Sequence, residues 1–473
     1  MSTFSGLGTA LSSLIAQRQA LEVSGQNVAN ANTVGYTRQR ASLSSLPAAS
    51  VASMFATNNG VGQGTYVNGI ERLGDLFADT RVRTQTSGAA YLAEISAAYT
   101  ELETNVGEPA DTGLASQLSD MWTSWQDVAK GSEKDSARAV LLERSTAVID
   151  RIGSLYTNAQ TQWNQAVTTT QALVTQTNAT AANIADLNDR ILAIQNSGGS
   201  ANELLDQRDL LVTSLAETVG ATARTRDNGE VDVFVGGNAL VDGAKSHDLA
   251  VTVPVSFTDA VENGGTVEVV WADTPTRPAG LTGGRVAGLL AVLAPPANGG
   301  LLTAAAASYD ALAQQIATQV NALHSTAKTA SGADGGDFFT FAAGKPAALG
   351  MTLAVTTSAG IAVGAAGQGA YDGTIGKQIA ALGTATDGPD ASWSATVVQL
   401  GVRSASASSR ASVSEAARAS AVQQQQSQTT VDTDEETVNM LAYQRAYEGA
   451  ARVMTAIDEM LDTLINRTGV VGR

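Results

Sequence analysis

A heptad pattern near the C-terminus is the feature that most constrains the fold. Between residues 431 and 468, apolar side chains recur at alternating steps of three and four. They are Met440, Tyr443, Tyr447, Ala450, Met454, Ile457, Leu461 and Leu464. This spacing places them on one narrow face of a helix, as in coiled coils. Carboxylates between Asp432 and Glu436 precede them, where a helix dipole favours anions. The sequence therefore predicts a C-terminal helix that packs against other helices.

The N-terminus carries a weaker form of the same pattern. Arg18 and Gly25 interrupt its heptad, whose apolar positions are Leu7, Leu11, Leu14, Leu21 and Val28. The pattern stops at Asn30–Arg38, because Asn and Gly tolerate the left-handed backbone that ends a helix. We expect an extended segment after this stop. Matching patterns at the two ends predict that the terminal helices pair, and we call their apolar positions the assembly seam.

The terminal helices could instead be core helices that pack onto the middle of their own chain. Two features favour assembly with neighbouring molecules. The C-terminal seam is narrow, and the opposite face of the helix is polar, with Gln444, Arg445, Glu448, Arg452 and Glu459. A two-helix hairpin with narrow seams buries little apolar surface alone, so we expect it to become ordered when neighbours cover the rest.

Long stretches without helix breakers dominate the interior. Residues 133–196 contain no Pro and one Gly, so they predict a helix that would span about 95 Å if unbroken. Residues 202–219, 301–328 and 393–428 are also expected to be helical. Val231, Val233 and Val235 alternate with polar residues and predict a strand. Further strands are expected at 249–255 and 266–271, and short strands with many turns at 340–374.

These elements predict an elongated α+β protein, mainly a helical coiled-coil rod with paired termini and small β-rich insertions. We expect residues 1–50 and 428–473 to form the paired terminal helices. The helical rod would comprise 51–339 and 391–427, with a β-hairpin region at 221–275. Residues 340–390 would form a small projecting β-rich insertion.

Composition excludes several classes of partner. The net charge is −17 and the pI is about 4.5, and no Lys/Arg cluster offers a site for nucleic acid or an anionic membrane. No apolar run approaches the roughly 20 residues of a membrane span. The chain has no cysteine, which excludes disulfides and thiolate sites. Residues 1–18 lack the pattern of a cleavable signal peptide.

Nothing in the sequence has the spacing of a catalytic or metal site. His247 and His324 are far apart and have no Cys to act with. Asp334 to Asp337 lacks the alternating oxygens of a calcium loop. The densest carboxylates, at 432–436, are explained by the start of a helix. We therefore predict a non-enzymatic protein without catalytic, cofactor-binding or metal-binding residues.

One motif stands at the end of the N-terminal helix, and its residues include Asn27, Asn30, Asn32, Gly35, Tyr36 and Arg38. This motif resembles that of the flagellar axial proteins, which form rods, hooks and their junctions. The stretch Asn202–Val212 is similar to one typical of the hook-associated protein 1 family, and rod and hook proteins lack it. Further matches follow in order at Gly283–Leu290, Asn321 with His324, Gly335–Phe339, Gln424–Glu436 and Leu464–Asn466.

The resemblance implies an extracellular structural role at the junction between the flagellar hook and the filament. Partners would be hook protein, the second hook-associated protein and copies of the chain itself in a ring. Family members leave by the flagellar type III export channel, which fits the expected lack of a cleavable signal. A cytoplasmic export chaperone binds the C-terminal helix in the family, here around Val438 to Leu464.

Two other classes of function are compatible with the residue pattern alone. A secreted coiled-coil scaffold or adhesin would use the same terminal helices without any flagellum. A glycan hydrolase would need a pair of carboxylates, and carboxylates are plentiful in this chain.

Overall fold

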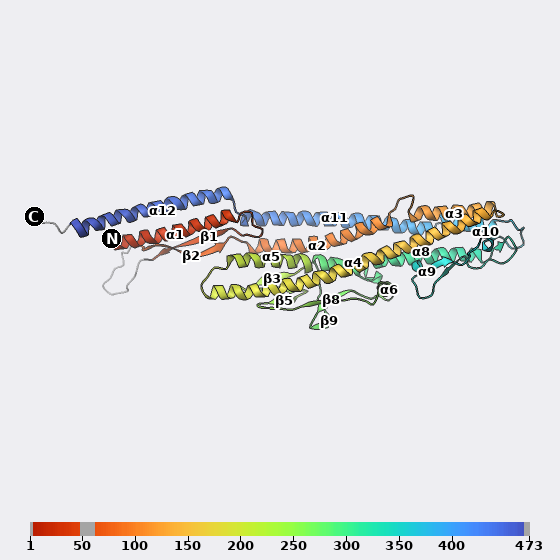
Figure 1. Ribbon diagram of the computed structural model, residues 1–473, viewed down its shortest axis with the longest axis horizontal. Coiled ribbons are helices and arrows are strands. Elements are labelled where there is room, and N and C mark those ends of the chain that lie inside the picture. The colour runs from red at the N-terminus through yellow and green to blue at the C-terminus, as the bar shows by residue number, and fades with distance from the viewer. Residues whose placement is uncertain (1–2, 48–61, 468–473) are drawn as a thin grey trace, which may run out of the picture.

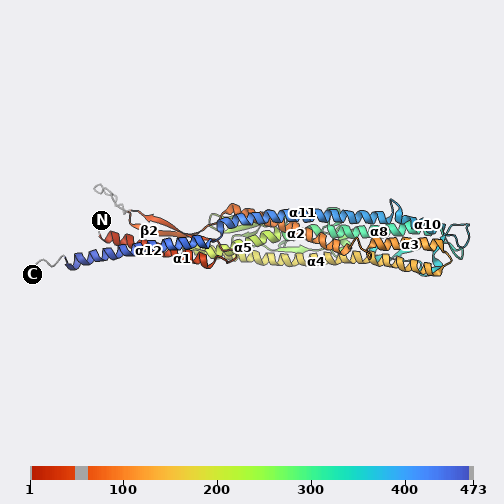
Figure 2. The same cartoon turned by 90° about the horizontal axis from the view of Figure 1, so that it is seen from above.

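The computed structural model describes residues 3–47 and 62–467 and shows a long, thin molecule (Figures 1 and 2). Helices run along its length, and small antiparallel sheets lie on the flank of the helical rod. Both termini lie at the same end. The predicted class, an elongated and mainly helical α+β protein with terminal helices side by side, is confirmed. The outer limits of the predicted terminal unit, including 48–50 and 468–473, fall outside the described residues.

The terminal unit consists of two helices and a hairpin. Helix α1 (Thr3–Ala29) lies beside α12 (Thr433–Asp462), which continues as a π-helical turn at Thr463–Arg467. Strand β1 (Gln39–Leu46) pairs antiparallel with β2 (Gly64–Arg72), with a bulge at Ser42/Leu43. The core here is thin: Ala20, Val23 and Ala41 are buried and pack against Val67, Ile70 and Tyr443.

A bundle of long helices forms the rod. Its members are α2 (Leu76–Val106), α3 (Leu114–Lys130), α4 (Asp135–Asn196), α5 (Asn202–Val219), α7 (Gly284–Leu293), α8 (Leu301–His324), α10 (Thr374–Ala381) and α11 (Pro389–Thr429). The predicted helix at 133–196 is confirmed as one unbroken helix of 62 residues, α4. The rod core is continuous, and Trp125, Tyr156, Tyr309 and Phe338 are among its largest fully buried side chains.

Two small sheets pack against α4. One has the order β3 (Thr222–Thr225), β4 (Val231–Val235), β5 (Asn238–Asp242) and β6 (Lys245–Ser246). The other has the order β7 (Leu249–Thr252), β8 (Glu268–Trp271) and β9 (Thr274–Pro278), with α6 (Phe257–Glu262) between β7 and β8. Fully buried Asn188 of α4 holds the first sheet, because its amide donates to the carbonyls of Val231 and Gly243, at 2.8 Å each.

Short elements close the far end of the rod. They are β10 (Lys328–Thr329), β11 (Phe339–Phe341), α9 (Ala347–Gly350), β12 (Met351–Leu353) and β13 (Ala362–Gly364), with single 3-10 turns at 358–360 and 382–384. A further 3-10 turn, at 296–298, joins α7 to α8. Strand β10 pairs with β13, and β11 with β12. The short strands expected within 340–374 are therefore present. Met351, Ile361 and Val363 of this segment are buried in the rod core.

Several boundaries differ from the sequence-based expectation. The strand expected at 249–255 ends at Thr252, because Pro254 has no N–H to donate to a ladder, and an irregular segment leads into α6. The helix expected to begin at 393 begins at Pro389, a residue suited to the first turn of a helix. The helix expected through 328 ends at His324, whose ring bonds to the loop that follows.

Candidate assembly interface

The family-like motif forms the connection between α1 and β1. Asn27, 1% exposed, accepts hydrogen bonds through Oδ1 from the Gln39 backbone N–H (3.0 Å) and the Tyr36 hydroxyl (2.8 Å). Its Nδ2 donates to the Gln39 carbonyl at 2.8 Å. The Asn27 amide thus pairs with both backbone groups of the first residue of the strand. Gly35 has φ +81°, and an added Cβ would lie 2.4 Å from Leu210, so a side chain at this turn would be both strained and obstructed.

Arg38 joins the two ends of the chain. Its Nε donates to Glu436 at 2.7 Å, and its other nitrogens donate to Glu435 at 2.8 and 3.0 Å. The hydrogen bonds that Arg38 donates to Glu435 raise the pKa of Arg38, and the same contact lowers the pKa of Glu435. The Arg38 backbone N–H also donates to the Thr429 carbonyl at 2.9 Å. The first turn of α12 is therefore tied to the end of the N-terminal motif.

The acidic start of α12 has a second role as a helix cap. The Asp432 side chain accepts from the backbone N–H groups of Asp434 (2.9 Å) and Glu435 (3.2 Å). Glu436 is 2% exposed and faces Arg38. The densest carboxylates in the chain therefore cap a helix and hold the opposite terminus.

Ion pairs connect the terminal unit to the rod. Arg72, the last residue of β2, lies 2.7 Å from Asp206 and 2.8 Å from Asp209 of α5, and Arg83 of α2 lies 3.2 Å from Asp209. The Thr37 backbone N–H donates to Asp206 at 3.2 Å. Burial raises the pKa of Asp206, and nearby Arg72 offsets part of that rise. We call these four charged residues the junction network.

The sequence did not reveal the junction network. Asp206 and Asp209 fell within the stretch that resembled the hook-associated protein 1 family, but their partner Arg72 was not singled out. Asn202, at the start of the same stretch, donates to the Ile70 carbonyl of β2 at 3.0 Å. The sequence signal for this contact was the start of a helix in which Asn202, Asp206 and Asp209 recur at steps of four and three and so share one face. That signal does not say which residues they meet.

The assembly seam is divided between the pair and the solvent. On α1, the face buried against its neighbours carries small residues, Ala10, Ala16 and Ala20, whereas the seam lies beside that face. Among the seam positions, Leu7, Leu14 and Leu21 are half-buried, and Leu11 and Val28 are 51% and 39% exposed. The signal for the buried face was a set of alanines on one side of a helix, which is weaker than a row of leucines.

On α12 the predicted seam faces α1 more closely. Ile457 is 8% exposed, and a Cβ added at Gly6 of α1 would lie 3.1 Å from its side chain. Met440, Tyr443, Ala450, Met454 and Leu461 are half-buried, while Tyr447 and Leu464 are 42% and 54% exposed. Outside the seam, α12 and the π-helical turn after it expose a further apolar set: Val438, Leu441, Val453, Met460 and, in the turn, Ile465, each more than half exposed.

The candidate histidines have structural environments. His324 is fully buried; its Nδ1 donates to the Gly336 carbonyl at 2.6 Å, and its Nε2 accepts from the Ala362 N–H at 2.9 Å. His247 lies edge-on to Trp271, with ring centroids 6.5 Å apart. Across residues 3–47 and 62–467, no three His, Asp or Glu side chains gather in a way that could hold a metal ion. Within the same ranges, no helix is long and apolar enough to cross a membrane.

Comparison with known proteins decides the family. The helical domain of the flagellar hook-associated protein FlgK matches residues 99–339. Hook-associated protein 1 of Bacillus subtilis is 30% identical over an alignment of 513 positions, which covers all of both chains. The chain belongs to the flagellar hook-associated protein 1 family.

Other members and related families agree with this assignment. Hook-associated protein 1 of Escherichia coli is 30% identical over 358 residues, covering 72% of this chain and 61% of its own length. The flagellar hook junction protein FlgK from Burkholderia pseudomallei has the same fold, with a TM-score of 0.62 at 16% identity, over 74% of this chain and all of that one.

The two ends match two further families of flagellar proteins. Residues 7–37 match the flagella basal body rod proteins, and residues 422–467 match the C-terminal region of the basal body rod FlgEFG proteins. The first segment contains most of α1 and of the motif, and the second contains α12. The resemblance inferred from the motif is therefore confirmed, and the chain is a structural component of the flagellum.

Proposed function

We propose that the chain joins the flagellar hook to the filament, and that it assembles through α1 and α12 without catalysing a reaction. The observation that carries this proposal is the apolar surface that the terminal pair leaves exposed. Val438, Leu441, Val453 and Met460 of α12 are each more than half exposed, and Ile15 of α1 is 49% exposed. Neighbouring copies, hook protein on one side and the second hook-associated protein on the other would cover this surface.

The proposal also gives the junction network a role. In this proposal, the terminal helices of many copies form an inner tube, and the rods lie outside it. The tube can carry the rods only if each terminal unit keeps a fixed orientation relative to its rod. The ion pairs from Arg72 to Asp206 and Asp209 of α5, with the bond from Thr37 to Asp206, supply three separate connections at one point. We propose the division into a terminal unit (1–50 and 428–473), a rod and a far β-rich segment on this basis, with β2 joining the terminal unit through its pairing with β1.

Export is part of the same proposal. We propose that the chain passes through the flagellar type III channel and that a cytoplasmic chaperone covers Val438 to Leu464 before assembly. The exposed apolar set on α12 would otherwise associate non-specifically in the cytoplasm. If so, chain retained in an export-deficient strain carries a bound partner, and removal of that partner speeds hydrogen exchange in α12. Unchanged exchange would contradict the chaperone site.

Substituting an exposed apolar residue of α12 tests the assembly surface. Val453→Asp places a charge on a side chain that is 51% exposed in the isolated chain, so the monomer should fold normally. In the assembly the charge would be buried without a partner, which is costly. In a strain that lacks its own copy, we expect at least a tenfold loss of attached filaments, counted by electron microscopy.

Two further measurements define the result. Thr455→Asp is the matched control, because Thr455 is exposed and its hydroxyl bonds within α12, to the Ala451 carbonyl. We expect this variant to keep its filaments. The Val453→Asp chain should also accumulate in the culture medium, which separates lost assembly from lost export. Normal filament numbers with Val453→Asp would show that this face of α12 is not an assembly surface.

No contact in the described residues favours a glycan hydrolase or a scaffold outside the flagellum. The carboxylates at 432–436 cap α12 and hold Arg38. They are thus explained as part of the terminal unit.

A further inference from the structure

An apolar knob projects from the β-rich flank of the rod. Residues Val253, Pro254 and Val255 form it, between β7 and α6. Val255 is 99% exposed and Val253 is 39% exposed. The helix that follows is firmly seated, because Phe257 is 2% exposed and its ring centroid lies 5.6 Å from those of both Tyr156 and Trp163 of α4. The knob is therefore an exposed apolar feature on an anchored base.

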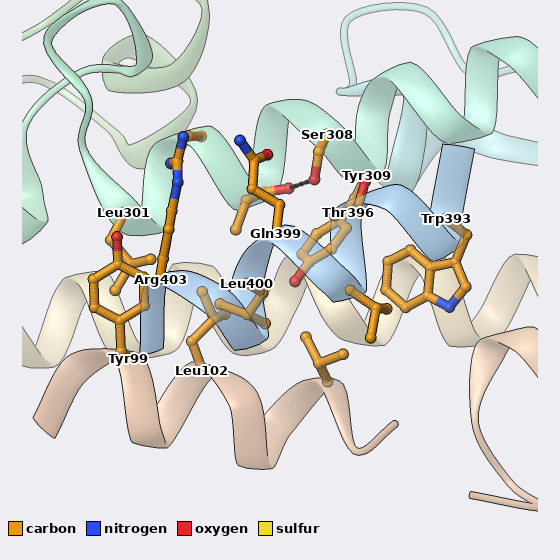
Figure 3. A pocket seen from close by; sticks show the side chains of 14 residues that line it. Tyr99, Leu102, Leu301, Ser308, Tyr309, Trp393, Thr396, Gln399, Leu400 and Arg403 are labelled. Atoms are coloured by element: carbon orange, nitrogen blue, oxygen red, sulfur yellow. Dashed lines mark hydrogen bonds between the residues drawn. The ribbon is translucent and has the colours of Figure 1, made fainter. Parts of the chain in front are cut away.

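A cavity of matching chemistry opens between α2, α8 and α11. Figure 3 shows side chains from all three helices converging on it, including Tyr99, Leu301 and Leu400. These three lining residues are half-buried, so the cavity is open to solvent. Its volume is about 110 Å³. Because apolar cavities of about 150 Å³ can hold benzene, this one has room for a single aliphatic side chain.

Further apolar surface borders the cavity. Val398 and Val402, on the same stretch of α11, are 63% and 64% exposed. One wall is fixed by the Trp393 indole N–H, which donates to Glu108 at 3.1 Å. Arg403 lies at the rim and forms no salt bridge within residues 3–47 and 62–467. A partner that fills the cavity would therefore also cover exposed valines and meet an unpaired cation.

The knob and the cavity occur at the same level of the rod. Ser308 and Tyr309 line the cavity. The α2 wall of the cavity lies beside the middle of α4, because Arg151 donates to the Val106 carbonyl at 2.8 Å and Gln162 donates to the Ala98 carbonyl at 3.0 Å. Phe257 of α6 packs on the same stretch of α4, at Tyr156 and Trp163. Helix α6 packs on α8 and α4, and Figure 1 shows α11 above α8 and α6 below it. The two features thus occur at the same height along the rod, on different sides of α8.

We propose that the Val253–Val255 knob of one copy inserts into the α2–α8–α11 cavity of a second copy beside it. This inference rests on the proposed function, because rods that stand parallel in a ring bring the two flanks together at equal height. A contact between two different surfaces of the same chain is heterologous, and repetition of it closes a ring or builds a helix. The knob side also carries Asp259 and Glu262 on α6, which would meet Arg403 at the rim.

Net charge makes an apolar contact of this kind more favourable than other lateral surfaces. Each copy carries a formal charge of −17, so adjacent rods repel each other over most of their length. Val253 and Val255 are uncharged, and so are the exposed valines of α11. At the rim of the cavity, Arg403 of one copy would lie near Asp259 and Glu262 of the other, which are of opposite charge. The lateral contact therefore places two rods side by side where their mutual repulsion is weakest.

Cross-linking between introduced cysteines tests the contact directly, because the natural chain has none. Val255→Cys marks the knob, and Gln399→Cys marks the cavity wall. In a strain that lacks its own copy and expresses both variants together, isolated flagella are treated with a short bismaleimide. We expect cross-linked dimers at least ten times above those of either variant expressed alone, since a heterologous contact joins 255 only to 399.

The control and the contrary outcomes are distinct. Val140→Cys replaces Val255→Cys in the control, because Val140 of α4 is 50% exposed and lies away from the knob. If filaments attach normally but mixed flagella give no 255–399 dimers, the lateral contact is wrong and the proposed function stands. Dimers from Val255→Cys alone would indicate an isologous contact and also overturn the inference. If the unaltered chain fails to restore filaments to the deletion strain, the proposed function itself fails.

Discussion

Single side chains in this protein act mainly by satisfying backbone groups where the chain changes direction. Asn27 pairs with both backbone groups of Gln39, and His324 joins the end of α8 to Gly336 and Ala362. The sequence marked both positions, Asn27 through a motif and His324 as one of two histidines. It could not show their partners, because each bond reaches a backbone group whose place depends on the folded chain. The role of Arg72 could not be predicted for the same reason, since an isolated Arg in a strand forms no recognisable sequence pattern.

The environment of His324 predicts a pH-dependent stability. Burial lowers its pKa below the ordinary value, and neutral imidazole is required because Nε2 accepts a hydrogen bond from Ala362. The unfolded chain therefore binds a proton more readily than the folded chain below about pH 6.5. The stabilisation is complete above that pH and is lost as the pH falls. Thermal unfolding measured at pH 7.5 and 5.5 should show a larger decrease for the natural chain than for His324→Asn.

The second histidine supplies the control for this measurement. His247 is exposed and lies beside Trp271. His247→Asn should retain the pH dependence of the natural chain, since the buried imidazole is unchanged. An equal pH dependence in the His324→Asn and natural chains would show that His324 does not determine it.

At the level of elements, periodicity predicted some helices well and missed others. Helices α4 and α12 followed from long runs without breakers and from a heptad pattern. Helix α2 and strand β2 were not anticipated. The buried face of α2 includes Val82, Thr86 and Ala89, which form no apolar row in the sequence. Strand β2 is explained by its pairing with β1 and by Arg72 at its end, and both are tertiary contacts.

The connection between β2 and α5 predicts strong coupling between Arg72 and Asp206. Arg72→Met would leave the Asp206 carboxylate buried without its cation, which costs about 3–5 kcal/mol. The double variant Arg72→Met/Asp206→Leu should lose less stability than the two single losses combined, by about 1–3 kcal/mol. Urea unfolding followed through exchange of the Thr37 amide reports on this site, because that amide donates to Asp206.

An exposed ion pair in the same unit provides the matched control for this cycle. Arg18 and Glu22 of α1 are 3.5 Å apart, and both side chains are more than 60% exposed. Arg18→Met should cost less than about 1 kcal/mol, as surface pairs do. If Arg72→Met is no more destabilising than Arg18→Met, the junction network does not hold the terminal unit to the rod.

For the molecule as a whole, the depth of burial falls from the rod toward the termini. The rod has one continuous core, with Trp125, Tyr156 and Tyr309 fully buried or nearly so. The terminal unit has a thin cluster around Ala20 and Val23. The heptad pattern predicted that the ends would pair, but it could not show that small residues of α1 form much of the buried face. Some apolar side chains at heptad positions, such as Leu11 and Tyr447, are instead left at the surface.

This gradient predicts how the isolated monomer exchanges its amide hydrogens. Along α12, Glu436 and Ile457 are buried, whereas α4 is buried along most of its length. Segments with few buried contacts open at low free energy. Amides from Leu441 to Leu464 should therefore exchange at least a hundred times faster than those in the middle of α4, and should become protected in isolated hook–filament junctions. Strong protection of this segment in the free monomer would contradict the idea that neighbouring copies complete the terminal unit.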